Sequence, residues 1–132
     1  MKKTGILNQP ISAAIAGLGH MDTLVIADAG LPIPSTTTRI DLALVAGIPR
    51  FEDTLRAVLA EMVVERAVVA EEVVSVSPEM YERMRELLGD VPIETVPHTE
   101  LKERTRVASA VVRTGEFTPY ANVILVAGVS FG

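Results

Sequence analysis

The sequence contains no cysteine and no tryptophan, and it has only two histidines. The absence of cysteine excludes disulfides, a thiolate nucleophile and cysteine-based zinc or iron–sulfur sites. Basic residues are also few, with 12 Lys and Arg against 17 Asp and Glu, for a net charge of −5. They form no cluster, and nucleic-acid binding requires concentrated positive charge. We therefore do not expect a nucleic-acid partner.

Long apolar runs are missing as well, since no stretch approaches the length that spans a membrane. The first residues, MKKTGILNQPIS, lack the apolar core of a signal peptide, so we expect a cytoplasmic protein with no membrane partner. A chain of 132 residues predicts a single domain over 1–132. Its 48% hydrophobic residues and mean hydropathy of +0.35 give a surplus of apolar material for a small domain. We expect part of this surplus to lie in contacts of a homo-oligomer.

Short apolar runs alternate with segments of helical periodicity along the chain. Helices are predicted after Asn8 as N-cap, from Pro49 to about Met62, after Ser77 as N-cap to Gly89, and from about Thr99 to Arg106. Strands are predicted over 23–27, 39–47, 66–72, 91–96, 107–114 and 122–128.

This alternation predicts an open α/β sheet with helices on both faces. The last two strands depart from this alternation, because no helix lies between them. The segment 115–121 that joins them is too short for a parallel crossover. The sixth strand should therefore run antiparallel to the fifth.

Polar residues follow several of these strands at one predicted edge of the sheet. Ligands of open α/β sheets bind beyond the carboxyl ends of the strands. Asp28 follows the first strand, His98 follows the fourth, and an antiparallel last strand brings Tyr120 and Asn122 to the same edge. Carboxylate, imidazole, phenol and amide together suit a polyhydroxylated ligand such as a sugar, which needs both donors and acceptors.

Each of these residues also has a purely structural interpretation. Asp28 before Ala-Gly is typical of a turn, His98 of a helix start, and Tyr120 of a loop anchor. If His98 begins a helix, the dipole keeps its ring neutral, and a neutral imidazole can shuttle protons. Lys102 lies four residues after His98, where a solvent-facing role is the first expectation. Glu71 and Glu72 are interpreted as a solvated strand end and are not assigned to the site.

His20 does not fit this edge, because it precedes the first strand while Asp28 follows it. At roughly 3.3 Å per extended residue, eight residues span about 26 Å. If both residues serve one site, different subunits must supply them. Alternatively, His20 is a helix C-terminal residue stabilised by the helix dipole.

Six stretches resemble the ribose pyranase and fucose mutarotase family nearly end to end. They are GILN at 5–8, LGHMDTLVIADAGLPIP at 18–34, RIDLAL at 39–44, AEEV at 70–73, RTGEFTPYANVIL at 113–125 and the closing GVSFG. The first, second and fifth are the most specific. The loop STTTR, at 35–39, is one where we expect family members to vary.

The resemblance implies a three-layer α/β/α fold with a mostly parallel six-stranded sheet whose last strand is antiparallel. It implies an isomerase that interconverts the β-pyranose and β-furanose forms of D-ribose, without a cofactor, in ribose uptake and catabolism. His20 falls on the family's proton donor, and Asp28, His98, Tyr120 and Asn122 fall on its substrate-binding positions, with Lys102 a looser match. The family also implies a homodecamer with sites at subunit interfaces.

Two other functions remain open on the sequence. A metal hydrolase could use His20, His98 and Asp28 as a facial set, although no HExxH pattern is present. A non-catalytic sugar-binding accessory protein of a ribose transport system would use the same residues without turnover.

Overall fold

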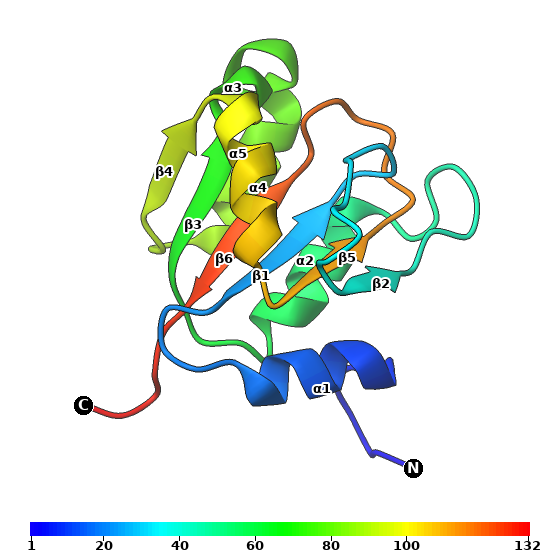
Figure 1. Cartoon of the computed structure of the whole chain (residues 1–132), viewed down its shortest axis with the longest axis vertical. Helices are drawn as coiled ribbons and strands as arrows, with labels where there is room; N and C mark the ends of the chain where they lie inside the picture. The colour runs from blue at the N-terminus through cyan, green and yellow to red at the C-terminus, as the bar shows by residue number, and fades with distance from the viewer.

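The computed structural model describes all 132 residues, which form six strands, five α-helices and one short 3₁₀ helix (Figure 1). The strands are β1 (Thr23–Ala27), β2 (Arg39–Asp41), β3 (Val64–Ala70), β4 (Ile93–Val96), β5 (Ala110–Arg113) and β6 (Val123–Ala127). The helices are α1 (Gln9–Gly17), α2 (Phe51–Leu59), α3 (Glu71–Val76), α4 (Pro78–Leu88), α5 (His98–Arg104) and the 3₁₀ helix η1 (Thr105–Val107).

The strands form one mixed sheet in the order β2-β5-β1-β6-β3-β4. The pairs β2–β5, β5–β1 and β3–β4 are parallel, whereas β6 is antiparallel to both of its neighbours, β1 and β3. The predicted direction of the last strand relative to β5 is therefore confirmed. The two strands are not neighbours, however, because the connection passes over β1 and inserts β6 at the centre of the sheet.

Helices cover both faces of the sheet, as the sequence predicts. Alternate residues of β1 point to opposite faces: Leu24 and Ile26 pack in the larger core cluster, and Val25 and Ala27 in the smaller one. The larger cluster holds the buried residues of α1, α2 and α4, while the smaller one contains Leu101 of α5. In Figure 1, α5 accordingly lies in front of the sheet and α2 and α4 lie behind it. No helix combines the length and apolar character needed to cross a membrane.

The predicted strand over 39–47 is wrong beyond residue 41. Asp41 Oδ1 accepts a hydrogen bond from Ala43 N (3.1 Å), which turns the chain away from the sheet edge. Gly47 has a φ of 82°, in the left-handed region that glycine adopts at little cost.

Other boundaries also differ from the prediction. Strand β3 ends at Ala70 instead of residue 72, because Glu71 and Glu72 begin α3. Strand β5 begins at Ala110 instead of residue 107, since η1 occupies the preceding turn. Asn8 caps α1 as predicted, with its Oδ1 accepting from Ile11 N at 2.9 Å, whereas the Ser77 side chain caps no backbone group of α4.

Candidate active site

The carboxyl ends of the parallel strands and the start of β6 meet at one edge of the sheet, as predicted. Because β6 is antiparallel to β1, its first residue, Val123, pairs with Ile26 near the end of β1. Asp28 and Asn122 therefore emerge side by side. His98 begins α5, two residues after the end of β4, at the same edge.

Asp28 and Asn122 form a reciprocal pair of hydrogen bonds. Asp28 N donates to Asn122 Oδ1 (2.9 Å), and Asn122 Nδ2 donates to Asp28 Oδ2 (3.1 Å). The other carboxylate oxygen of Asp28 accepts from Gly30 N at 3.0 Å. Asn122 is fully buried, so it orients the Asp28 carboxylate from within the core.

His98 and Tyr120 form the second part of the site. Their ring centroids are 5.0 Å apart at an interplanar angle of 81°, an edge-to-face contact that fixes both rings. His98 Nδ1 is buried and has no hydrogen-bond partner within the chain. A buried polar atom without a partner is costly, so this nitrogen is a candidate contact for a ligand.

Burial changes the protonation of both Asp28 and His98. It is the largest cause of the raised pKa of Asp28, against the opposing hydrogen bonds from Gly30 and Asn122. Burial also lowers the pKa of His98, and the positive charge of Lys102 lowers it further. The ring is therefore neutral at pH 7, as we expected, with burial as the largest cause and Lys102 as the second.

The segment that carries Tyr120 is held in an unusual conformation. Tyr120 has a φ of 64°, which a non-glycine residue adopts only when its surroundings impose it. Ser77 Oγ donates to Pro119 O at 2.8 Å and so ties this loop to the start of α4. The Ser77 hydroxyl thus anchors the Tyr120 loop instead of capping a helix.

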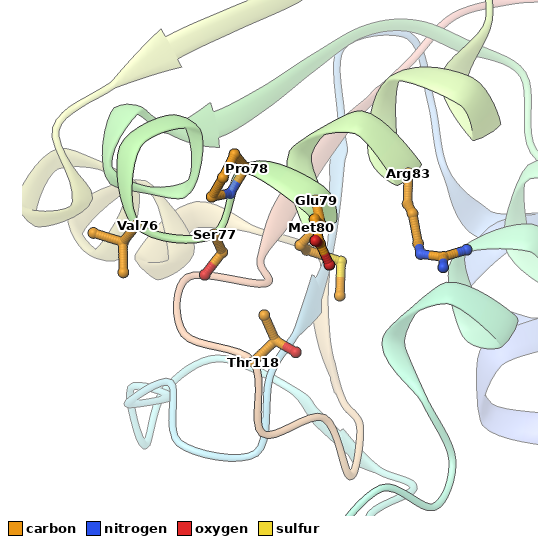
Figure 2. Close-up of a pocket in the computed structure, with 7 residues that line it drawn as sticks. All are labelled: Val76, Ser77, Pro78, Glu79, Met80, Arg83 and Thr118. Atoms are coloured by element: carbon orange, nitrogen blue, oxygen red, sulfur yellow. The ribbon is translucent and has the colours of Figure 1, made fainter.

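Two hollows adjoin this loop. Figure 2 shows one of about 350 Å³, with Ser77 and Pro78 on one side and Thr118 facing them from the loop. None of the predicted site residues lines it. A second hollow of about 390 Å³ contains Asp28 and Arg113 and shares Thr118 with the first. Asp28 is the only predicted site residue that lines this second hollow.

His20 lies at the opposite edge of the sheet, in the turn before β1. Its Nε2 is 3.0 Å from Glu65 Oε2, at the start of β3, and its side chain is 54% exposed. The structure therefore brings together Asp28, His98, Tyr120 and Asn122, with Lys102 close to His98, but not His20. The facial metal set of His20, His98 and Asp28 is not formed within one chain.

One residue that shapes the site, Glu72, was not predicted from the sequence. Its two carboxylate oxygens accept from His98 N at 3.0 and 3.3 Å, which holds the first turn of α5 against the end of β3. Its placement on a solvated strand end is therefore wrong. The contact joins residues 26 positions apart. The only feature of the sequence that pointed to Glu72 was its place in the AEEV stretch.

The lowered pKa of His98 predicts a loss of stability on acidification. Because the folded pKa lies below the ordinary value of 6.5, the unfolded chain binds the proton more tightly. The contribution of His98 is complete above pH 6.5 and is lost as pH falls through the lower folded pKa. Urea unfolding at fixed protein concentration, from pH 7.5 to 5, should show a steeper loss in the wild type than in His98→Gln.

Lys102→Met provides the matched comparison, since it removes the second cause of the lowered pKa. Its stability should fall less steeply with pH than that of the wild type. An identical pH dependence in the wild type and His98→Gln would contradict the assignment.

The fold and this edge define a class of small α/β proteins with a polar site at the carboxyl edge of a mixed six-stranded sheet. A family model described as the RbsD / FucU transport protein family matches residues 1–130, and the chain belongs to that family.

Named relatives match over their full length. D-ribose pyranases of Geobacillus thermodenitrificans and Symbiobacterium thermophilum are 56% and 57% identical over 131 residues, which is 99% of this chain and 99% and 100% of theirs.

Solved structures agree. Bacillus subtilis RbsD, complexed with D-ribose, has a TM-score of 0.96 and 48% identity over 99% of this chain and 100% of its own. Fucose mutarotase from Streptococcus pneumoniae, in complex with L-fucose, has a TM-score of 0.82 and 26% identity over 95% of each chain. The family resemblance and the fold class predicted from the sequence are confirmed.

Proposed function

We propose that this chain is an isomerase that interconverts the β-pyranose and β-furanose forms of D-ribose, and that it works without a cofactor. The observation that carries the proposal is the edge where the Asp28–Asn122 pair and the His98–Tyr120 pair meet. The unpartnered His98 Nδ1 supplies a buried acceptor for a sugar hydroxyl. Relatives named D-ribose pyranase, and an RbsD structure complexed with D-ribose, support the choice of sugar.

The reaction requires two proton transfers at a sugar hemiacetal. The ring oxygen gains a proton while the anomeric hydroxyl loses one, which gives the open-chain aldehyde. Closure through a different hydroxyl reverses the exchange and gives the other ring size. No C–H bond breaks and no electron moves, so positioned acids and bases are sufficient.

The residues divide these tasks according to their chemistry. His20 delivers the proton to the ring oxygen. Asp28 and the neutral His98 hold sugar hydroxyls, and either can take the proton of the anomeric hydroxyl. Tyr120 orients the sugar ring, and Asn122 orients the Asp28 carboxylate that holds it. Burial and the charge of Lys102 keep His98 neutral.

This division of roles requires an oligomer, because His20 and Asp28 lie at opposite edges of one sheet. A neighbouring subunit then supplies His20 to each site. Exposed apolar side chains support such contacts, among them Leu44 at 76%, Phe117 at 71% and Val107 at 84% exposure. We propose a homodecamer of single-domain subunits, each formed by residues 1–132, acting in the cytoplasm in ribose uptake and catabolism.

Saturation-transfer NMR on equilibrated D-ribose tests the function directly. With the protein present, saturation of a β-pyranose signal should transfer faster to the β-furanose signal than in buffer. Measurable ribose binding with unchanged exchange would instead identify a non-catalytic sugar-binding accessory protein. Loss of the enhanced exchange on chelation would contradict the cofactor-free mechanism.

A further inference from the structure

We propose that Glu65 is a positioning residue for His20, an assignment that rests on the proposed function. Glu65 Oε2 lies 3.0 Å from His20 Nε2, although the two residues are 45 positions apart. Their side chains are 40% and 54% exposed, so a sugar held by a neighbouring subunit can reach the pair.

Strand β3 is irregular at Glu65. Val64 pairs with Ala127 and Arg66 pairs with Val126, so Glu65 is an extra residue without a partner on β6. A bulge of this kind changes the direction of a side chain, and bulges are frequent beside active sites. Here the bulge lies at Glu65, whose side chain contacts His20 in the turn before β1.

Gly128 leaves room for this arrangement. A Cβ atom placed on Gly128 would lie 3.2 Å from the Cβ of Glu65, closer than such contacts normally are. A larger residue at 128 would therefore press on Glu65 at the bulge. The glycine that follows β6 thus leaves space for the Glu65 side chain beside His20.

The turn that carries His20 is fixed by the same end of β6. Met21 adopts a φ of 76°, and its backbone N donates to Ala127 O at 2.9 Å. Asp22 completes the turn, since its carboxylate accepts from Gly19 N at 2.8 Å and its carbonyl accepts from Ala127 N at 2.8 Å. The strained φ of Met21 and these hydrogen bonds hold the backbone beside His20 in one conformation.

The contact also determines which ring nitrogen faces the ligand. A carboxylate is only an acceptor, so His20 Nε2 must carry the proton in this bond. Nδ1, which makes no hydrogen bond within the chain, then faces the ligand. The donor is the doubly protonated ring: Nδ1 gives its proton to the sugar ring oxygen, and the neutral ring that remains keeps its proton on Nε2, hydrogen-bonded to Glu65. Glu65 therefore sets both the orientation and the tautomer of the ring, as carboxylates beside functional histidines do.

Two variants separate orientation from charge. Glu65→Ala removes the acceptor, and we expect the exchange rate at saturating ribose to fall about tenfold. This is less than the ~10²–10⁴-fold contribution of a positioned acid or base, because His20 itself remains. Glu65→Gln keeps an amide oxygen that can accept from Nε2, so it should lose less. The ribose dissociation constant should remain within about twofold in both, because the sugar-holding residues lie at the other edge. Glu82→Gln, which breaks an exposed ion pair with Arg85 on α4, is the matched control and should retain the wild-type rate.

A double-variant cycle tests whether Glu65 acts through His20. In a His20→Ala background, Glu65→Ala should cause no further loss of exchange, measured at raised protein concentration. An equal loss in both backgrounds, or full activity of Glu65→Ala, would overturn the positioning role alone. A wild-type protein that does not accelerate exchange would instead overturn the proposed function and, with it, this assignment.

Discussion

His20→Ala should lower the rate of pyranose–furanose exchange by about 10²–10³-fold, while ribose binding changes only several-fold. In the proposed mechanism this change removes the proton donor and leaves Asp28, His98, Tyr120 and Asn122 in place at the opposite edge. Saturation-transfer NMR gives the rate and calorimetric titration with ribose gives the dissociation constant. A variant with full exchange would refute the donor role and would leave His20 as a structural residue of the turn before β1, three positions beyond the end of α1.

Mixed oligomers of His20→Ala and Asp28→Ala subunits test whether one site is shared between chains. If a neighbour supplies His20, random mixing in equal amounts restores an intact Asp28 and an intact His20 together at about one quarter of the sites. The mixture should therefore exceed the summed activity of the two parents. Native mass spectrometry, with one parent isotopically labelled, shows whether the subunits have mixed. Mixed assemblies without restored activity would contradict the shared site.

The local pattern of the sequence predicted most of the fold. The continuous apolar run 23–27 corresponds to β1 residue for residue, because a strand buried on both faces needs apolar side chains throughout. The Ser77-Pro78 pair placed the start of α4 correctly, and the short 115–121 connection gave the direction of β6. The edge that unites Asp28, His98, Tyr120 and Asn122 followed from that topology.

The features that the sequence did not predict depend on long-range contacts. Nothing near Glu72 indicates that it will hold His98, and nothing near Glu65 indicates a bulge opposite Ala127. The position of β6 between β1 and β3 was likewise not predictable. The short connection indicates the direction of β6 relative to β5, but a short connection can still pass over one strand. Whether His20 and Asp28 serve one site depends on contacts between chains, because one chain holds them at opposite edges of the sheet.

Asn122→Asp should destabilise the fold strongly at neutral pH, by about 3 kcal/mol or more, because it creates an uncompensated buried charge. Asn122 is fully buried, and its Nδ2 donates to Asp28 Oδ2 at 3.1 Å. The substitution replaces this donor by a second carboxylate, next to an Asp28 whose pKa burial already raises. Two carboxylates at this distance oppose each other's ionisation, so one takes up a proton in the folded state.

The pH dependence distinguishes this repulsion from simple loss of a hydrogen bond. Burial already raises the pKa of Asp28 above 3.8 in the wild type, and a second carboxylate beside it should raise the pKa further. The penalty should therefore be largest above that raised pKa and shrink as pH falls toward 3.8. Asn122→Ala, the control, removes the same bonds without adding charge and should cost about 1–3 kcal/mol. Urea unfolding at fixed protein concentration should show the two variants far apart at pH 7.5 and converging near pH 4. A constant difference between them would mean that the carboxylates of the variant do not interact.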